Sequence, residues 1–355
     1  MHNEVRKDYI LDRYVIIAAE RAKRPSDFPM KSVESNERKN CSFCPGNEQL
    51  TPPADLIYQL AGKKIVKKED FDDIRYKGWI IRCFPNLYPA LSPKAKQFLL
   101  QDSRLYISRG AYGFHEIVVE SANHDEHPHK AGLNQLKFMF DACLELLKDF
   151  YNKEAIEYVQ IFRNHRKEAG ASLSHAHTQI IAIPMLPHVI KEEFIGSNQY
   201  YDKEKKCIYC KILAEEKSGP RIIYESEKFV AITPWASVHP FEFWILPKRH
   251  ESSLLNITEP EKVDFIKTLR ISLGGLANIL NDPPYNYGFH ISSKPNTENK
   301  SYHWHLEVYP KLSIWAGFEL STGMHINVIP PEIAAKSLRE PIEKELDSLS
   351  TEFYS

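Results

Sequence analysis

Apolar residues follow two spacings along the chain, and these predict strands grouped around one long helix in each half. Spacings of three and four predict helices over 133–151 and 258–280, the second capped by Thr258 with Pro260 in its first turn. Short β-branched and aromatic runs predict strands. These are 14–19, 79–84, 115–120, 158–162 and 175–182 in the first half, and 229–233, 242–246, 287–291 and 302–309 in the second.

Strands grouped around a single helix per half favour an α+β fold with antiparallel sheets over a doubly wound parallel sheet. The chain has 355 residues, which is enough for two domains that each bury a core. The polar stretch 196–206 is the predicted linker, so the predicted units are 1–195 and 196–355.

One arrangement of cysteines and histidines occurs twice. Each copy has a Cys-x-x-Cys pair, an isolated histidine, and then a His-x-His pair. The isolated histidine precedes the His-x-His pair by 51 residues in the first copy and by 53 in the second, although its distance from the Cys-x-x-Cys pair differs more. Such repetition indicates two related units. The residues are Cys41, Cys44, His124, His175 and His177, and then Cys207, Cys210, His250, His303 and His305.

Each copy offers the ligands of a zinc site, since zinc takes four nitrogen or sulfur ligands and two thiolates commonly come from one tight turn. We predict one zinc ion per unit, both structural because four protein ligands leave no open position. A redox dithiol beside ordinary histidines is the alternative, and the duplication disfavours it. The predicted ligands are Cys41, Cys44, His124 and His175, and Cys207, Cys210, His250 and His303.

Three histidines compete for the isolated position in the first copy. His124 directly follows a predicted strand, as His250 does in the second copy, and is chosen for that reason. His127 and His129 are expected to be solvated.

Composition narrows the class of protein. The 46 basic and 47 acidic residues give a net charge of −1, which disfavours a large surface for nucleic acid or an acidic membrane. No run of about 18 apolar residues is present, and the first residues lack the apolar core of a signal peptide. We expect a cytoplasmic protein, with the two single cysteines, Cys83 and Cys143, in the core.

His177 has the surroundings of a reactive histidine. Residues two apart on a strand share a face, so His175, His177 and Gln179 point the same way. A metal bound to His175 would fix the strand and hold His177 toward whatever lies above it. Upstream, residues 169–172 offer a tight turn that contains Gly170 and a hydroxyl, which suits a phosphate. We therefore predict a chemical role for His177.

These motifs resemble the galactose-1-phosphate uridylyltransferase family, the transferase branch of the histidine-triad superfamily. The likeness rests on Asn164, the run from His175 to Gln179, the first Cys-x-x-Cys pair and the basic run 21–25. Residues 207–212, the run ending at His250 and the segments 317–319 and 326–327 add to it. It covers nearly the whole chain and implies two tandem histidine-triad-like units related by an approximate internal two-fold.

The resemblance implies a two-step nucleotidyl transfer between a nucleotide sugar and hexose 1-phosphate, without magnesium. His177 would attack the α-phosphorus and form a nucleotidyl-histidine. Family resemblance also suggests a homodimer in which residues 317–319 complete the partner's site. By matching position, the substrate-binding residues would be Asn164, Gly170, Ser172 and Gln179 for the nucleotide phosphates, Asn86 and Leu87 for base and ribose, Arg21 and Arg24 for the hexose phosphate, and Gly317, Phe318 and Glu319 for the hexose.

Departures from the usual family pattern concern the substrate. Ala176 stands where the family usually has proline, and Ser313-Ile314 stands where the best-known uridylyltransferases have Lys-Phe. Ala176 and the segment 281–287 look more like the ADP-glucose phosphorylase branch. UDP-glucose:galactose-1-phosphate uridylyltransferase is our main hypothesis and the adenylyl enzyme its alternative.

Two other classes of protein are alternatives. A histidine-triad nucleotide hydrolase would use the same His177 with water as acceptor. A non-catalytic zinc module for RNA or protein would have no need of Gln179 beside that histidine. In the second unit His305 is followed by Leu306-Glu307 rather than x-Gln, and bulky Trp304 separates it from His303, so we predict that His305 is not a nucleophile.

Overall fold

The structure is a computed structural model, and it describes residues 2–21, 41–62, 64–71, 73–95, 99–103, 105–293 and 299–352. Its strands are β1 (Glu4–Lys7), β2 (Tyr14–Ile17), β3 (Leu56–Ala61), β4 (Lys64–Lys68), β5 (Trp79–Pro85), β6 (Leu99–Asp102), β7 (Ile107–Arg109), β8 (Phe114–Val119), β9 (Tyr158–His165), β10 (His177–Ile183), β11 (Ile222–Glu225), β12 (Phe229–Ile232), β13 (Phe243–Pro247), β14 (Tyr285–His290), β15 (His305–Pro310) and β16 (His325–Asn327).

The helices are α1 (Leu133–Tyr151), α2 (His188–Glu204), α3 (Ile208–Glu216), α4 (Glu259–Leu280), α5 (Gly317–Thr322) and α6 (Pro331–Glu352). Four short 3-10 turns join them within the described residues: η1 (Ala19–Arg21), η4 (Glu48–Leu50), η5 (Lys167–Ala169) and η6 (Leu254–Asn256).

Eleven of the described strands form one sheet in the order β11-β12-β13-β15-β14-β9-β10-β8-β5-β3-β4. Every pairing within it is antiparallel, which confirms the predicted α+β class. The order is mirrored about the central pair β9–β14. The next strand outward is β10 beside β9 in the first half and β15 beside β14 in the second half. Each of these two strands begins at the second histidine of a His-x-His pair. This order agrees with the predicted internal two-fold, which remains a prediction.

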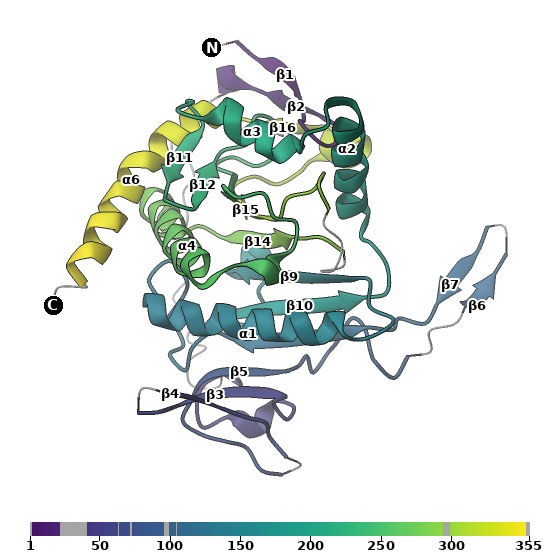
Figure 1. The fold of residues 1–355 in the computed structure, drawn as a ribbon, viewed down its shortest axis with the longest axis vertical. Helices are drawn as coiled ribbons and strands as arrows, with labels where there is room; N and C mark the ends of the chain where they lie inside the picture. The colour runs from purple at the N-terminus through teal and green to yellow at the C-terminus, as the bar shows by residue number, and fades with distance from the viewer. Residues whose placement is uncertain are drawn as a thin grey trace.

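Helices α1 and α4 cover one face of the sheet, one over each half (Figure 1). The three-and-four spacing places Leu136 and Phe140 of α1 in the same core as Phe265 and Leu269 of α4. The Thr258 hydroxyl and Glu261 form a capping box at the start of α4, as such a residue pattern favours. Both predicted helices are confirmed.

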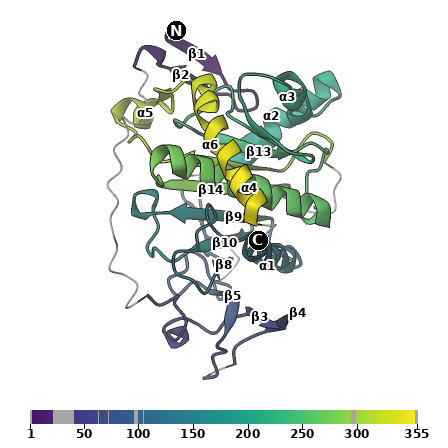
Figure 2. The ribbon, with the colours of Figure 1, turned by 90° about the vertical axis from the view of Figure 1, so that its left-hand side faces the viewer.

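Helix α6 crosses α4 on its outer side (Figure 2). The crossing is close because α4 has two glycines there. A Cβ atom on Gly274 would lie 2.6 Å from Glu345, and one on Gly275 would lie 2.5 Å from Ile342. These glycines are therefore packing residues.

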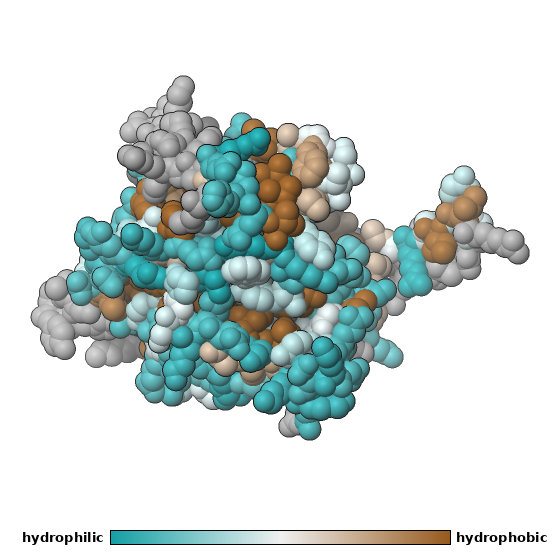
Figure 3. Space-filling view, turned by 90° about the horizontal axis from the view of Figure 1, so that it is seen from above, coloured by the Kyte–Doolittle hydropathy of each residue, from teal (hydrophilic) through white to brown (hydrophobic). Residues whose placement is uncertain are grey.

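Two small sheets stand apart from the large one. Strands β1, β2 and β16 form a three-stranded sheet at the end of the molecule beyond the second half (Figures 1 and 2). Strands β6 and β7 form a projecting arm with apolar residues exposed along it (Figure 3). Leu105, Tyr106 and Ile107 on this arm are 83 %, 65 % and 68 % exposed. Within the described residues, no helix is both long and apolar enough to span a membrane.

The predicted linker over 196–206 is wrong for most of its length, because α2 continues to Glu204. The polar residues Glu193 and Ser197 of α2 are buried, and the Glu193 carboxylate is hydrogen-bonded to His290 and Tyr302. The boundary between residues 195 and 196 therefore falls inside a helix, and the two domain limits remain a prediction.

Candidate functional site

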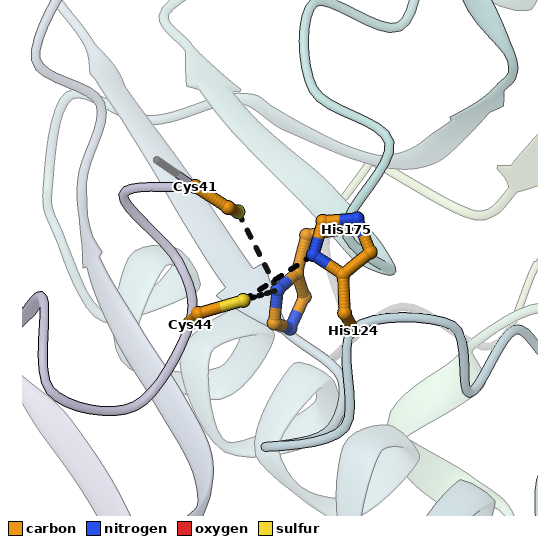
Figure 4. Close-up of side chains that lie close together, drawn as sticks. All are labelled: Cys41, Cys44, His124 and His175. Carbon is orange, nitrogen blue, oxygen red and sulfur yellow. Dashed lines mark hydrogen bonds between the residues drawn. The ribbon is translucent and has the colours of Figure 1, made fainter. Parts of the chain in front are cut away.

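Four side chains from three segments far apart in the sequence meet beside the start of β10 (Figure 4). Cys44 Sγ lies 3.3 Å from His124 Nδ1 and 3.5 Å from His175 Nδ1. Cys41 Sγ lies 3.6 Å from His175 Nδ1, and the four atoms lie within 4.8 Å of one another. Two ligands of a tetrahedral zinc ion, bound at about 2.0–2.3 Å, are about 3.6 Å apart. The predicted first set is thus brought together in a fitting arrangement.

The second nitrogen of each ring also has a partner. His175 Nε2 donates to the carbonyl oxygen of Ser121 at 2.8 Å, and His124 Nε2 lies 2.9 Å from Ser174 Oγ. A ring that donates from Nε2 presents an unprotonated Nδ1 to a metal. The bond to the Ser121 carbonyl oxygen therefore fixes the tautomer that a metal site needs at His175, and the Ser174 hydroxyl is able to accept from His124 in the same way.

The second cluster repeats this arrangement. Cys210 Sγ lies 3.5 Å from His250 Nδ1 and 3.7 Å from His303 Nδ1, with Cys207 in the same group. His303 Nε2 donates to the carbonyl oxygen of Pro247 at 2.9 Å. The hydrogen bond from Cys207 and the facing imidazoles lower the pKa of the Cys210 thiol, and the same bond raises the pKa of Cys207, so Cys210 ionises first of the two.

His177 begins β10 and is 5 % exposed. Its Nδ1 donates to the carbonyl oxygen of His175 at 2.8 Å, which leaves the lone pair on Nε2. Among the described residues Nε2 has no hydrogen-bond partner. Burial lowers the pKa of His177 to about 4, so the ring is neutral at pH 7. Phe43, from the turn between the two cysteines, packs edge-on against it with ring centres 5.4 Å apart.

Gln179, two residues further on, is held by a histidine that the sequence analysis missed. His115 Nδ1 accepts the backbone N–H of Ala90 at 3.3 Å, so its Nε2 carries the proton and donates to Gln179 Oε1 at 2.9 Å. The amide nitrogen of Gln179 is thereby left for another acceptor. Asn86 Nδ2 lies 3.2 Å from the same His115 nitrogen. His115 shares a face of β8 with Ile117 and Val119, and this polar residue on an apolar strand face was the available signal.

Asn164 contacts the predicted phosphate turn at Gly170. Asn164 Nδ2 donates to the Gly170 carbonyl oxygen at 3.5 Å, and its Oδ1 accepts from Asn286 at 2.8 Å. Gly170 has a φ of +88°, the left-handed region that glycine adopts without strain. Ser172 follows and is exposed, and Leu87, beside Asn86, is exposed as well.

A buried ion pair lies behind His177. Arg163 Nη1 donates to the carbonyl oxygen of His177 at 3.0 Å and to the carboxylate of Glu120. Thr178 Oγ1 donates to the same carboxylate at 2.7 Å. These contacts fix the backbone on which His177 stands. Sequence reasoning missed the pair, because only the fold brings β8 and β9 to the two sides of β10.

The residues predicted to bind the hexose lie in a different part of the fold from His177. Arg21 ends η1 beside the three-stranded sheet and is exposed, and Gly317, Phe318 and Glu319 begin α5 next to β16. In Figure 2 α5 lies near the top beside β2, and β14 and β9 lie between its level and β10. Arg24 lies outside the described residues. The structure therefore does not bring these residues to His177 of the same chain.

His305 has its reactive nitrogen occupied. Its Nδ1 donates to the carbonyl oxygen of His303 at 3.0 Å, just as His177 bonds His175, but its Nε2 lies 3.1 Å from Glu307 Oε1. The His305 side chain is fully buried beside Tyr209 and Trp244. The prediction that it is not a nucleophile fits this arrangement.

The expectation that His127 and His129 are solvated is wrong. Both side chains are largely buried, and burial lowers the pKa of His129 to about 3 and that of His127 further. Both lie against His165 at the end of β9, with ring centres 4.7 and 5.8 Å from it.

Comparison with known proteins extends along nearly the whole chain. The protein-family model of the galactose-1-phosphate uridyl transferase N-terminal domain matches residues 1–187, and the family model of the C-terminal domain matches residues 145–341. An ADP-glucose phosphorylase of Arabidopsis thaliana is 35 % identical over 95 % of this chain and 92 % of its own. A galactose-1-phosphate uridylyltransferase of Thermotoga maritima is 29 % identical over 95 % and 98 %.

Solved structures give the same result. The crystal structure of an ADP-glucose phosphorylase from Arabidopsis thaliana with bound ADP-glucose has a TM-score of 0.77 and 33 % identity, over 95 % of this chain and 99 % of that chain. A structure of uridylyltransferase has a TM-score of 0.73 and 26 % identity, over 96 % and 99 %. Together with the duplicated Cys2His2 clusters and the histidine held beside one of them, these matches show that the chain belongs to the galactose-1-phosphate uridylyltransferase family of nucleotidyltransferase enzymes.

Proposed function

We propose that the chain moves a nucleoside monophosphate between a nucleotide sugar and a phosphate-bearing acceptor, with His177 as the carrier. The observation that supports this most directly is the hydrogen bond from His177 Nδ1 to the carbonyl oxygen of His175. It leaves the Nε2 lone pair of a neutral imidazole as the nucleophile.

In the first half-reaction a bond forms between Nε2 and the α-phosphorus, and the bond from that phosphorus to the bridging oxygen breaks, releasing hexose 1-phosphate. The imidazole then carries a positive charge, which the His175 carbonyl oxygen stabilises through Nδ1–H. In the second half-reaction an acceptor phosphate oxygen attacks the same phosphorus, and the nitrogen–phosphorus bond breaks. Both steps are substitutions, so no redox partner is required.

The phosphates need donors, and the neighbouring residues supply them. Gln179 lies on the same strand face as His177, and because His115 bonds its amide oxygen, its amide nitrogen has no hydrogen-bond partner within the part of the chain that the structure describes. Asn164, Gly170 and Ser172 would hold the nucleotide phosphates from the adjoining turn. Asn86 and Leu87, at the end of β5, would contact ribose and base.

We propose a homodimer in which each chain supplies the hexose-binding residues of its partner's site. These residues are Arg21, Arg24 and the segment 317–319. This would explain why the hexose residues stand apart from His177 in a single chain. The exposed apolar arm β6–β7 supports association, since isolated proteins rarely expose such a patch.

We propose zinc for both Cys2His2 clusters, two structural ions per chain, because sulfur and imidazole donors in a closed set of four are typical of structural zinc. Thiolate ligands also need a reducing compartment, which supports a cytoplasmic location. Bound zinc would fix the turn that carries Phe43 and the backbone of His175, and so hold His177 in place.

Transfer from UDP-glucose to galactose 1-phosphate is our main proposal. Adenylyl transfer from ADP-glucose is the second candidate, favoured by the identity of 35 % to an ADP-glucose phosphorylase against 29 % to a uridylyltransferase, and by Ala176 and Ser313.

One exchange experiment decides among these reactions. The protein is incubated with UDP-glucose or ADP-glucose and with labelled glucose 1-phosphate, galactose 1-phosphate or inorganic phosphate. Label entering the nucleotide sugar or a nucleoside diphosphate identifies donor and acceptor. Release of nucleoside monophosphate alone would instead indicate the histidine-triad hydrolase alternative and contradict the transfer.

A further inference from the structure

A second group of histidines lies outside the nucleotidyl-transfer residues, where the two halves of the chain join. His129 lies in the loop before α1, His165 is the last residue of β9, and Asp282 lies in the turn that follows α4. His165 is 2 % exposed and pairs in register with Tyr285 of β14. Three separate segments from both halves therefore converge here.

The ligand atoms of this group are close enough to share one ion. His165 Nε2 lies 2.8 Å from Asp282 Oδ1, and His129 Nδ1 lies 3.9 Å from the same oxygen. All three atoms lie within 4.8 Å of one another, the same limit that the two Cys2His2 clusters satisfy. One atom from each side chain can therefore face a common point.

Each side chain has the charge that a metal site needs, and a metal bound to His165 Nε2 would replace the hydrogen bond from that nitrogen to Asp282, with the proton moving to Nδ1. Burial lowers the pKa of His129 to about 3 and lowers that of His165, so both rings are neutral near pH 7. Burial opposes ionisation of Asp282, but the hydrogen bond from His165 and the nearby Arg166 outweigh it and hold its pKa well below the usual range. The group thus consists of two neutral imidazoles and a carboxylate.

Neighbouring residues orient the carboxylate. Arg166 donates to Asp282 Oδ2 from Nε at 3.2 Å and from Nη2 at 2.8 Å, which leaves Oδ1 facing the imidazoles. Arg163 donates to His127 Nδ1 at 2.9 Å, so His127 packs against the group without presenting that nitrogen to it. The ligand set is therefore His129, His165 and Asp282.

A purely hydrogen-bonded cluster would explain His165, Asp282 and Arg166 but not His129. The Nδ1 atom of His129 is buried, faces Asp282, and has no hydrogen-bond partner among the described residues. An unsatisfied buried nitrogen costs about 1–3 kcal/mol, which a metal–nitrogen bond would remove.

We propose that His129 Nδ1, His165 Nε2 and Asp282 Oδ1 bind a third divalent transition metal, of the class of Zn²⁺, Fe²⁺ or Co²⁺. Two imidazoles and one carboxylate suit these ions and leave positions for water, whereas Mg²⁺ and Ca²⁺ prefer oxygen ligands. The proposal concerns metal binding and does not depend on the reaction at His177.

Binding here is weaker than at the Cys2His2 clusters. The other nitrogen of His165, Nδ1, has no partner among the described residues, whereas His175 and His303 both donate to a backbone carbonyl. Such outer contacts are worth about 10–100-fold in metal affinity. The positive charge of Arg166 acts in the same direction. The third ion is therefore expected to leave first when a chelator is added.

The test uses the full-length protein, dialysed against a mild chelator until metal analysis shows that only the Cys2His2 ions remain. Co²⁺ is then titrated and followed by metal analysis and visible absorption. One further equivalent should bind and give d–d bands without the thiolate-to-cobalt charge-transfer band, because the three ligands are nitrogen and oxygen. No further equivalent, or one with a thiolate band, would overturn the proposal.

Two variants locate the ion. Asp282→Asn and His129→Gln should each weaken Co²⁺ binding at least about tenfold. His129→Gln is decisive if Asp282→Asn fails to fold, because the structure gives His129 Nδ1 no hydrogen bond to lose. His188→Gln, at an exposed histidine at the start of α2, is the matched control and should bind like wild type. Equal affinity in His129→Gln and wild type would overturn the assignment.

Discussion

The two halves of the chain hold the same histidine in the same way and differ in what faces its second nitrogen. His177 and His305 both donate from Nδ1 to the carbonyl oxygen of the histidine two residues before them. Near His177 the residue two further on is Gln179, which bonds His115 instead. Near His305 it is Glu307, which lies 3.1 Å from Nε2. Backbone geometry alone therefore does not make the histidine reactive.

The flanking residues separate the two halves further. Ala176 lies between the first pair of histidines and Trp304 between the second, where its ring packs against Phe229 and Phe265 of the core. His290 and Glu193 complete a fully buried polar group around His305. In the first half His177 Nε2 has no hydrogen-bond partner among the described residues, whereas in the second half both nitrogens of His305 take part in a buried hydrogen-bonded group.

Replacing each histidine with glycine should give the largest contrast. His177→Gly is expected to lower exchange by at least about 10⁴-fold, because it removes the atom that carries the nucleotide, while metal content is kept. Added imidazole should restore part of the activity by filling the space. His305→Gly should lose stability and retain exchange in the folded fraction. Equal activity losses in both variants would contradict the assigned difference.

Removing a metal ligand should affect stability in both halves and chemistry in one. His175→Ala and His303→Ala are each expected to lose one metal ion per chain and at least about 3 kcal/mol of unfolding free energy. Only His175→Ala should also reduce exchange beyond its loss of folded protein, since it supports His177. Metal analysis, thermal unfolding and exchange measured together test this. Full metal content in either variant would exclude that residue as a ligand.

Exchanging the residue two positions after each histidine tests the comparison itself. Gln179→Glu should lower exchange roughly 100-fold, because a carboxylate repels the phosphates and competes for Nε2 of His177. Glu307→Gln should leave exchange unchanged and reduce stability, because His290 loses a neighbouring negative charge. Unchanged kinetics in Gln179→Glu would show that Gln179 does not face the nucleotide.

A smaller effect is expected from pH. Burial opposes the charge on His290, but Glu193 and Glu307 outweigh it and raise its pKa to about 9. Because this folded-state pKa exceeds the unfolded value of about 6.5, the stabilisation is complete below pH 6.5 and is lost as pH rises through 9. The melting temperature should fall by about 5 °C over that range. His290→Gln should remove this dependence, and an unchanged slope would contradict the charge assignment.

Local patterns predicted much of the fold. The helix over 133–151 and the Thr258 cap were correct, because spacing and capping act within a few residues. Helix α2 was missed because its polar residues Glu193 and Ser197 are buried against distant partners. Helix α6 was also not predicted. It contains Pro341, a residue type that normally argues against a helix interior.

The candidate site divides in the same way. The eight predicted metal ligands were chosen from their repetition, and the structure brings each set together into a cluster that could hold a metal ion. His115, Arg163 and the burial of His129 were missed, because each depends on which strands lie side by side. The hexose residues were named from family resemblance, and their distance from His177 becomes clear only in the fold.

The central claim is that His177 carries the nucleotide and His305 does not. Intact protein is mixed with UDP-glucose or ADP-glucose, without acceptor, and its mass is measured, followed by peptide mapping under conditions that preserve phospho-imidazole. The account predicts one nucleoside monophosphate per chain, located on His177, absent in His177→Gly and present in His305→Gly. An adduct on another residue, or none in wild-type protein that still catalyses exchange, would contradict it.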